Sequence, residues 1–303
     1  MVMKIKRLVT MLRDWRWMLF FLQRRVRKPS SRDAAVRIIA RLRPATAEPA
    51  PAQAVRALRE EGQVKLDRLL DRTQCEEVRR YLMENAVHDD YRPEAGPWLP
   101  LSGERHPHSH VGYHDHEDVV RAPYLLALAN RPDILALVEG ALGCRPTISY
   151  LAAWWSYATG IAAQQAENFH RDVDDWRFIK LFVYLTDVDA TKGPHVYVRR
   201  SAGVKRGLTL RRYSDDEIAQ TFPAEDIVTM TGEAGSGFLE NTYGFHKGQP
   251  LIEGHRLIFQ VVYSMFPLPY GPRRPVIGRA EAASFAGECL DPFVNRVYVT
   301  RNG

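Results

Sequence analysis

The sequence predicts an α+β protein, mainly β in its second half, in the form of a sandwich or jelly roll with helical additions on its N-terminal side. Short segments rich in aromatic and β-branched residues fill the second half, and Gly, Pro, Asp or Asn separates them, which is typical of sheet strands. Apolar residues at helical spacing dominate the first half. The helices precede the strands and do not alternate with them, and the chain has no GxxxxGK(S/T) or GxGxxG motif. These observations disfavour a parallel α/β fold.

Basic residues gather at the beginning of the chain. Residues 1–48 contain 13 Lys or Arg and 3 Asp or Glu, so their net charge is +10. Since the whole chain carries +6, the remainder carries −4, and the basic character belongs to a tail. The three cysteines lie far apart and form no CxxC pair, which fits a reducing cytoplasm.

An apolar, aromatic run within this tail, residues 15–22, is followed by the basic cluster of residues 24–28. The run is too short to cross a bilayer, which needs roughly 20 apolar residues, and no small-residue cleavage site of a signal peptide follows it. Two interpretations stay open. The run is either an interfacial helix on an anionic membrane surface, which would make the protein peripheral on the inner face of the membrane, or a helix docked on its own domain or on another subunit. A nucleic-acid arm is disfavoured because the aromatic residues are clustered and not interleaved with the charges.

The tail ends in a Pro- and Ala-rich stretch, residues 44–51, whose composition suits an extended linker. We therefore predict a basic amphipathic segment with its linker over 1–48 and a folded domain over 49–303. Thr73 and Glu76 can form a capping box at the beginning of one helix, and Gly143 can cap the end of another. The first elements of the domain are predicted as a helix over 54–61, a strand over 62–70, a helix from 73 to about 85 and an apolar helical stretch over 123–142.

The second half of the chain is predicted to hold five strands, over 147–155, 178–185, 195–198, 237–240 and 256–265. In the second of these, Lys180, Phe182 and Tyr184 share one face, and the opposite, wholly apolar face is predicted as core. Trp154 and Trp155 point to opposite faces of their strand. One of them is therefore predicted to be core and the other to line a pocket.

His170 and Asp172 lie two residues apart in the central segment. Residues two apart in an extended backbone project to the same face, so this pair can offer one nitrogen and one carboxylate oxygen to a single metal. With ten histidines in the chain, such a pair is weak evidence on its own, because one could arise by accident.

A second segment adds a third ligand and an anchor for an anion. His246 follows glycine-rich turns, and Arg256 opens an apolar strand ten residues later. Two histidines and one carboxylate leave positions on iron(II) open for a chelating cosubstrate and dioxygen, and the planar fork of arginine suits the far carboxylate of 2-oxoglutarate. His255 is the rival third ligand, but in a strand it points away from the Arg256 face, so His246 is preferred.

With these residues in this order, the sequence resembles the phytanoyl-CoA dioxygenase family of iron(II)/2-oxoglutarate-dependent oxygenases over roughly residues 61–266. The resemblance rests on Gly62-Gln-Val-Lys-Leu-Asp, Leu142-Gly143, His170-Arg-Asp172, Tyr184-Leu-Thr-Asp-Val-Asp with Gly193-Pro194, His246 and Arg256. It implies a double-stranded β-helix of the cupin-like jelly-roll type. It further implies His170, Asp172 and His246 as iron ligands, Arg256 on the distal carboxylate of 2-oxoglutarate, and Phe182 as an aromatic wall beside the cosubstrate.

The resemblance also bears on the reaction. Related halogenases generally lack the carboxylate that Asp172 provides, so hydroxylation of a C–H bond is expected. Where family members often have Pro-Gly-Ser-His, this chain has Val198-Arg199-Arg200-Ser201-Ala202. This departure places two arginines at the expected rim of the site and leaves the substrate open.

Two further features have competing interpretations. Trp176, four residues after Asp172, either forms the floor of a substrate pocket or packs its loop onto the body. Residues 105–116 hold five of the ten histidines but show no firm ligand spacing. A surface loop near the entrance of the site is therefore preferred to a zinc site.

The leading hypothesis is a cytoplasmic iron(II)/2-oxoglutarate-dependent dioxygenase that hydroxylates a small-molecule or lipid-linked substrate at a membrane surface. The sugar-acid region of lipopolysaccharide is one example of such a substrate. A non-catalytic jelly-roll binding module with a membrane-binding tail is one alternative, which the retention of all four site residues argues against. The other is a cupin-like metalloenzyme that does not use 2-oxoglutarate. Arg256 distinguishes this alternative from the leading hypothesis, because only an enzyme that binds 2-oxoglutarate is expected to use it.

Overall fold

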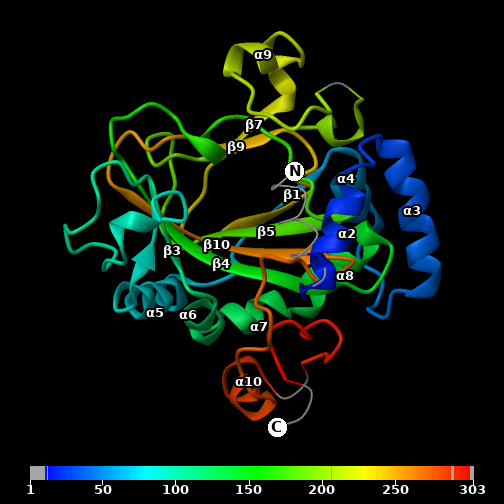
Figure 1. Cartoon of the computed structure of the whole chain (residues 1–303), viewed down its shortest axis with the longest axis horizontal. Coiled ribbons are helices and arrows are strands. Elements are labelled where there is room, and N and C mark those ends of the chain that lie inside the picture. Colours follow the sequence, from blue (N-terminus) through cyan, green and yellow to red (C-terminus); the bar gives the residue numbers. More distant parts are fainter. Residues whose placement is uncertain (1–10, 12, 206, 288–289, 301–303) are drawn as a thin grey trace.

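Two antiparallel sheets form the centre of the protein, as a computed structural model that describes residues 11, 13–205, 207–287 and 290–300 shows (Figure 1). The larger sheet has seven strands in the order β1-β8-β5-β10-β4-β3-β2, and the smaller has three in the order β7-β6-β9. This arrangement confirms the predicted jelly roll. The strands are β1 (Gln63–Leu66), β2 (Val87–His88), β3 (Val111–His114), β4 (Thr147–Tyr157), β5 (Phe178–Tyr184), β6 (His195–Val198), β7 (Ile227–Met230), β8 (Gly237–Glu240), β9 (His246–Gly248) and β10 (His255–Ser264).

The five strands predicted in the second half are β4, β5, β6, β8 and β10, each within two residues of its predicted ends. β1 is shorter than the predicted strand over 62–70, and the sequence did not predict β2, β3, β7 and β9. These four strands have only two to four residues each, which leaves little length for a periodic pattern, although β6 and β8, with four residues each, were predicted.

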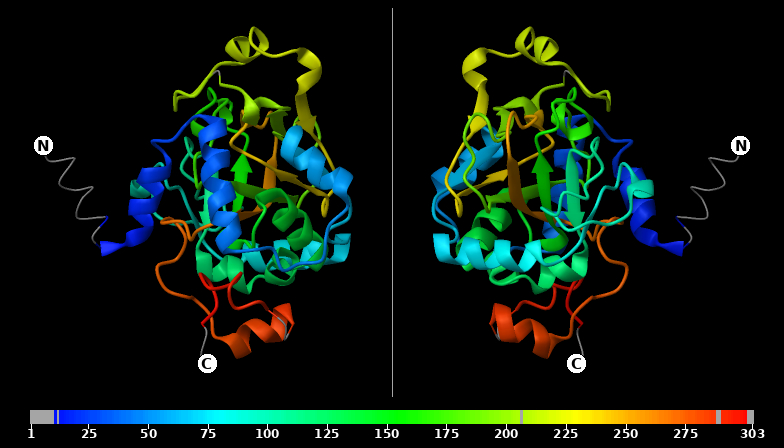
Figure 2. Two further views of the ribbon diagram at one scale, coloured as in Figure 1. Left: turned by 90° about the vertical axis from the view of Figure 1, so that its right-hand side faces the viewer. Right: turned by 90° about the vertical axis from the view of Figure 1, so that its left-hand side faces the viewer.

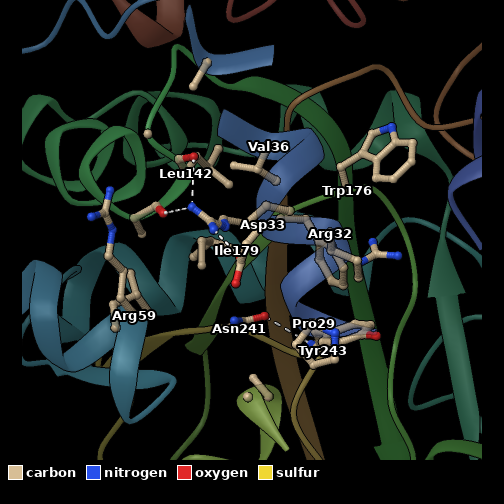
Figure 3. A pocket seen from close by; sticks show the side chains of 18 of the residues that line it. Pro29, Arg32, Asp33, Val36, Arg59, Leu142, Trp176, Ile179, Asn241 and Tyr243 are labelled. Atoms are coloured by element: carbon tan, nitrogen blue, oxygen red, sulfur yellow. Dashed lines mark hydrogen bonds and ion pairs between the residues drawn. The ribbon is translucent and has the colours of Figure 1, made fainter. Parts of the chain in front are cut away.

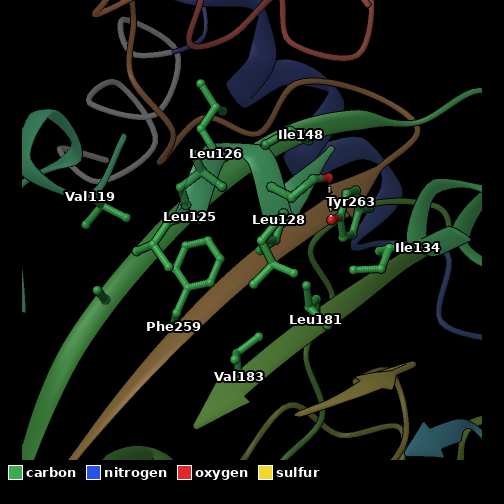
Figure 4. Close-up of a cluster of buried hydrophobic side chains, with 14 of the residues drawn as sticks. Val119, Leu125, Leu126, Leu128, Ile134, Ile148, Leu181, Val183, Phe259 and Tyr263 are labelled. Atoms are coloured by element: carbon green, nitrogen blue, oxygen red, sulfur yellow. Dashed lines mark hydrogen bonds between the residues drawn. The ribbon is translucent and has the colours of Figure 1, made fainter. Parts of the chain in front are cut away.

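Helices cover the outer face of the larger sheet. The layer consists of α5 (Arg72–Met83), α6 (His116–Arg121), α7 (Leu125–Ala129) and α8 (Pro132–Leu142), with α4 (Ala52–Glu60) beside α8 and α10 (Arg279–Ala286) beside α7. Figure 4 shows the core between these layers, where Leu125 and Leu128 of α7 face Phe259 of β10. Leu181 and Val183 also lie in this core, as predicted for their face of β5. The opposite face of the sheet is thereby left for the site.

Two helical predictions need correction. The capping box that begins α5 is formed by Asp71 and Gln74 and not by Thr73 and Glu76, because the Asp71 carboxylate accepts the Gln74 N–H at 2.8 Å. The predicted stretch over 123–142 is two helices, α7 and α8, because Pro132 lacks an N–H and begins a new helix. Gly143 ends α8 in the left-handed conformation, which confirms its predicted role as a cap.

The basic tail forms α2 (Trp15–Gln23) and α3 (Pro29–Leu42), and both helices pack on the body. Gln23 donates to the Val173 and Asp174 carbonyls at 2.8 and 3.1 Å, and Arg32 donates to the Asp175 carbonyl. In the linker, the Thr46 and Ala47 N–H groups donate to the buried Glu139 carboxylate. The docked interpretation of the tail is therefore supported for the described residues, whereas the boundary at residue 48 stays a prediction and residues 1–10 and 12 lie outside the description.

Two further features are the lengths of the helices relative to a membrane and the state of the cysteines. None of the helices within the described ranges is long and apolar enough to cross a membrane. Cys75 and Cys144 are buried and free of disulfides, and Cys289 lies outside the described residues.

The core between β5 and the helical layer should be a main source of stability. Leu181 is fully buried there, so Leu181→Ala is expected to lower the free energy of unfolding by about 2–5 kcal/mol. Met83, at the end of α5, is 37% exposed. Met83→Ala is the matched control and should change this free energy by less than about 1 kcal/mol. Urea unfolding monitored by circular dichroism measures both, and equal effects would contradict this assignment of the core.

Candidate metal centre and its cavity

His170, Asp172 and His246 converge at the mouth of the jelly roll. One ligand atom from each lies within 4.8 Å of the others, and within the described chain they are the one group of His, Cys, Asp or Glu that could hold a metal ion. His246 Nε2 is 3.2 Å from Asp172 Oδ2, and His170 Nε2 is 3.6 Å from Asp172 Oδ1. The structure thus brings the three predicted ligands together.

Backbone pairing aligns these residues. His170 and His246 form an isolated antiparallel bridge, in which each N–H donates to the carbonyl of the other at 3.0 and 3.1 Å. Two residues on, the Asp172 N–H donates to the Thr242 carbonyl at 2.9 Å. The intervening Arg171 points the other way and donates to the Tyr243 and Ser201 carbonyls. The alternation expected from the sequence is therefore fixed by hydrogen bonds on both sides.

Each histidine presents Nε2 to the site because its Nδ1 is already engaged. His170 Nδ1 lies 2.9 Å from the Asn168 carbonyl, and His246 Nδ1 lies 3.1 Å from the Gly244 carbonyl. A carbonyl can only accept, so both Nδ1 atoms carry a proton and Nε2 is the atom that each ring can offer to a metal. Burial, followed by the neighbouring His246, also lowers the pKa of His170 well below its ordinary value. Neutral imidazole is the form that binds a metal.

Lys180 orients the carboxylate of the group. Its Nζ lies 2.6 Å from Asp172 and 3.0 Å from Asp174. Burial alone would raise the pKa of the Asp172 carboxyl, but Lys180 and then His246 lower it well below its usual value. The same two carboxylates more than offset the burial of Lys180 and raise its pKa. Asp172 is consequently held ionised, as a ligand must be.

A cavity of about 380 Å³ runs from this group into the barrel, and the two residues predicted to contact the cosubstrate, Arg256 and Phe182, line it. Arg256 is buried and donates to the Gly193 carbonyl and, at 3.0 Å, to Ser156 Oγ. Its Nε has no hydrogen-bond partner among the residues that the structure describes. A buried guanidinium that faces a cavity with an unused N–H fits a carboxylate ligand.

The residues present fit the metal and cosubstrate that the sequence predicts. Two imidazoles and one carboxylate form the ligand set typical of non-haem iron(II). The free N–H of Arg256 suits the distal carboxylate of 2-oxoglutarate.

Tyrosines surround the other end of the cavity. Tyr150 pairs with Val262 and Ser156 pairs with Arg256 in the register of β4 and β10, so the two ends lie about 20 Å apart along the strands. Tyr150 and Tyr270, whose ring centroids are 5.1 Å apart, line this end. This end, which presents ring faces and hydroxyl groups, is the part of the cavity left for a substrate.

A buried pair of ionisable groups lies behind His246. His195 Nε2 is 3.0 Å from Glu240 Oε1, and the Glu240 side chain is fully buried. Burial raises the pKa of Glu240 to about 8, and burial together with the charge of Arg256 lowers that of His195 to about 3. The His195 ring packs 4.9 Å from Phe182 and 5.6 Å from His246, between centroids.

Four other residues that the sequence analysis considered for the site do not line the metal cavity. Trp176 is not brought into the metal cavity; it lines a separate cavity of about 480 Å³ beneath α3, with Arg32 5.9 Å from its ring (Figure 3). We therefore assign it no substrate contact. His255 lies against Trp155, 5.3 Å between ring centroids, outside the metal cavity. Arg199 and Arg200 both pair with Asp226, so the expected basic rim is not part of this cavity.

The structure also places the tryptophan pair, Trp154 and Trp155, and the histidine-rich segment of residues 105–116 relative to the cavity. Trp154 lines the cavity and Trp155 is fully buried core, as the alternation of their strand predicted. In the histidine-rich segment, His110 pairs with Glu167, a residue that lines the cavity, at 2.8 Å. This contact places part of the segment at the site, while the described residues give it no metal group.

Three contributors were not assigned from the sequence. Lys180 shares a strand face with Phe182, but alternation alone could not tell a cosubstrate contact from the contact to Asp172 that it makes. His195 opens β6 directly after Gly193-Pro194, and its pairing with Glu240 joins residues 45 positions apart, which no local pattern indicates. Tyr270 lies beyond β10 in a loop with no periodic signal.

Comparison with solved structures gives similar folds at low identity. The non-heme α-ketoglutarate-dependent carbocyclase SnoK from nogalamycin biosynthesis is 19% identical, with 73% of this chain and 86% of that chain covered and a TM-score of 0.50. HygX from Streptomyces hygroscopicus, with nickel, 2-oxoglutarate and hygromycin B bound, is 15% identical (70% and 86% covered, TM-score 0.50). EctD from S. alaskensis in its apoform is 15% identical (86% and 91%, TM-score 0.51).

These likenesses show that the chain shares the fold of 2-oxoglutarate-dependent enzymes. No family model matches the chain, and neither does any curated protein. Membership of the phytanoyl-CoA dioxygenase family therefore stays a prediction.

The two rival histidines allow a direct test of the metal group. His246→Ala removes one of three ligands and should weaken Mn²⁺ or anaerobic Fe²⁺ binding by at least about 100-fold. His255→Ala, on the outer face of the same sheet region, is the control and should leave the affinity within about twofold. Isothermal titration of the metal-free protein measures both. Equal affinities for the two variants would show that the metal is not held here.

Proposed function

We propose that this protein is an iron(II)/2-oxoglutarate-dependent oxygenase that hydroxylates a C–H bond of its substrate. The observation that carries the proposal is that one cavity contains the two-histidine, one-carboxylate group and a buried arginine with an unused N–H. A metal-binding module without 2-oxoglutarate has no need of that arginine. The alternatives, a non-catalytic binding module and a cupin-like enzyme without this cosubstrate, leave its burial unexplained.

The roles of the residues follow from their contacts. His170, Asp172 and His246 would hold the iron, and Lys180 keeps the Asp172 carboxylate ionised and oriented. Arg256 and Phe182 would position the cosubstrate on the side of the cavity away from the tyrosines. The bound iron and 2-oxoglutarate supply the oxidising chemistry, which couples cosubstrate decarboxylation to oxidation of the substrate. Asp172 occupies the position that halide would need, which favours hydroxylation over halogenation.

Arg256→Ala tests the use of 2-oxoglutarate. The variant should bind 2-oxoglutarate roughly 100-fold more weakly in the anaerobic iron(II) complex, because a buried charge-assisted pair is lost, while the affinity for iron(II) stays unchanged. The charge-transfer absorption of the complex measures the first quantity and calorimetry the second.

Arg200→Ala, which removes an arginine that is 54% exposed outside the cavity, is the matched control. If Arg256→Ala binds 2-oxoglutarate as tightly as the natural chain, the cupin-like alternative is favoured. If the natural chain forms no succinate in air with iron(II) and 2-oxoglutarate, either alone or with any of a panel of lipid-linked and sugar substrates, the proposal of an oxygenase fails.

We also propose that the enzyme works on a lipid-linked substrate at an anionic membrane surface, as the tail suggested. The polar residues of α2 face inward. Arg16 and Gln23 are buried against the body, while Trp15, Met18 and Leu22 are 53%, 52% and 51% exposed. A helix that docks only for stability buries its apolar side. The exposed apolar ridge therefore suits a second surface, and both views of Figure 2 place α2 at the outside of the molecule.

Basic side chains flank this ridge on both sides. They are Arg13, Arg273, Arg274 and Arg296 on one side and Arg24, Arg25, Arg27, Lys28 and Lys205 on the other. The one acidic residue in these two hollows, Asp14, is already paired with Arg16 at 2.7 Å. Apolar residues framed by basic side chains match the interface of an anionic bilayer.

α2 also touches the site. The ring of Phe20 lies 6.3 Å from that of Tyr270, which lines the substrate end of the metal cavity. A substrate held by its lipid in the bilayer would accordingly reach the cavity from the side on which α2 lies.

Vesicle flotation with the full chain tests this second proposal. The chain should float with phosphatidylglycerol-containing vesicles and not with phosphatidylcholine alone, and changing Trp15, Met18 and Leu22 together to Ser should weaken this binding by at least about tenfold, given the apolar area lost. Ile252→Ser is the control, because Ile252 is 75% exposed in a loop remote from α2 in sequence. Equal flotation of the triple variant and the natural chain, or no flotation of the natural chain, would contradict the proposal.

A further inference from the structure

The buried His195–Glu240 pair has no role in the site as described so far. Both side chains are almost fully enclosed, and His195 Nε2 lies 3.0 Å from Glu240 Oε1. Glu240 Oε2 has no hydrogen-bond partner among the described residues. Burial of two ionisable groups with an oxygen left unsatisfied is costly, and an apolar pair of similar size would be at least as stable. The pair therefore calls for a function other than packing.

The contact determines where the imidazole proton resides. An ionised Glu240 beside a neutral His195 would leave a net charge in a fully buried position without a second partner, which is the costliest arrangement. In the neutral pair, Glu240 carries one proton. If His195 Nε2–H donated to Oε1, that proton would lie on Oε2, where no residue that the structure describes could accept it. Glu240 therefore donates Oε1–H to Nε2, and the imidazole proton is on Nδ1. In the fully ionised pair, both ring nitrogens carry protons. Both remaining arrangements make His195 Nδ1 a hydrogen-bond donor.

His195 presents this donor beside Arg256. His195 lines the metal cavity together with Arg256 and Phe182, and Nδ1 has no partner within the described chain. The ring is held on one side by Phe182 and Phe238, at 4.9 and 5.2 Å between centroids, and on another by His246. It is thus a fixed donor between the metal group and the arginine, where an anionic cosubstrate that bridges the two would lie.

We propose that His195 is a second anchor for 2-oxoglutarate, with Nδ1–H donating to the cosubstrate and Glu240 acting as the positioning residue that keeps the proton on Nδ1. This assignment rests on the proposed oxygenase function. It extends the cosubstrate site of this chain from Arg256 alone to two donors on different strands, β10 and β6.

Side-chain geometry provides a matched set of variants. The amide N–H of asparagine reaches the position of Nδ1, whereas glutamine reaches that of Nε2. His195→Asn should therefore keep most of the affinity for 2-oxoglutarate, while His195→Gln and His195→Phe should each weaken it by roughly 10- to 100-fold, the effect of losing a hydrogen bond to a charged group. Affinity is measured through the charge-transfer absorption of the anaerobic iron(II) complex, at saturating iron.

Variants of Glu240 test the positioning role separately. The amide of Glu240→Gln can still donate to Nε2, so this variant should bind 2-oxoglutarate within about threefold of the natural chain, whereas Glu240→Leu should bind it about tenfold more weakly. If Gln and Leu weaken binding equally, Glu240 does not fix the proton and the proposal is overturned. It is overturned as well if His195→Phe binds 2-oxoglutarate as the natural chain does.

A purely structural role predicts a different result. If the pair only supports His246, then His195→Phe and Glu240→Leu should lower Mn²⁺ affinity or the thermal midpoint and leave the 2-oxoglutarate affinity of the metal-loaded protein unchanged. The natural chain is the control for the underlying function. Should it bind neither iron(II) nor 2-oxoglutarate, the oxygenase proposal fails; should it bind both while all His195 variants do the same, only the second anchor fails.

Discussion

Two backbone hydrogen bonds between His170 and His246 hold the site together. They join a loop that follows β4 to the first residue of β9, 76 positions later, and they set both imidazoles on one side. Because the bridge is antiparallel and extended, Asp172 falls on the same side two residues further on. No disulfide or long helix performs this task. The metal group is therefore a consequence of sheet pairing, and any change that separates β9 from this loop would disperse the ligands.

The larger sheet then spaces the remaining functions. β10 lies between β4 and β5, so its inward residues face a common cavity with theirs. Along this strand the register places Arg256 opposite Ser156 and Val262 opposite Tyr150 and Lys180. Because side chains alternate along the strands, one end of the cavity has the buried Arg256 guanidinium, and the other end has tyrosine rings and the ion pairs of Lys180 with Asp172 and Asp174. The outer face of the same strands is committed to the core, which keeps the cavity walls rigid.

Much of this was accessible from the sequence because it depends on local periodicity. The five predicted strands, the inward face of β5, the opposite orientations of Trp154 and Trp155, and the preference for His246 over His255 all follow from a period of two residues. β2, β3, β7 and β9 have two to four residues each and were not predicted, because so short a segment carries little pattern. β6 and β8 also have only four residues, and the turn residues around them made them recognisable. The start of α5 was misplaced because Asp71 and Gln74 compete with Thr73 and Glu76 for the same role, and local sequence alone does not rank them.

What the sequence could not supply are contacts between distant segments. Glu240 and His195 are each ordinary in their own strands, and only the tertiary fold buries them together. Trp176 was predicted near the site because it lies only four residues after Asp172. In the structure it lies beneath α3, with Arg32 5.9 Å from its ring, because α3 docks on this part of the body. Such assignments require the relative placement of elements, which periodicity does not encode.

The N-terminal helices illustrate how one element can serve two surfaces. α2 is fixed by polar side chains that reach inward. Arg16 donates to the Gly271 and Pro272 carbonyls, and Gln23 donates to the Val173 carbonyl in the loop that follows Asp172. These bonds attach it to two loops at the tyrosine end of the cavity, one of which carries Tyr270. Hydrogen bonds and the contact of Phe20 with Tyr270 secure the helix, while Trp15, Met18 and Leu22 remain outside. Burial of the polar face thus explains why α2 stays on the body while its apolar ridge remains exposed.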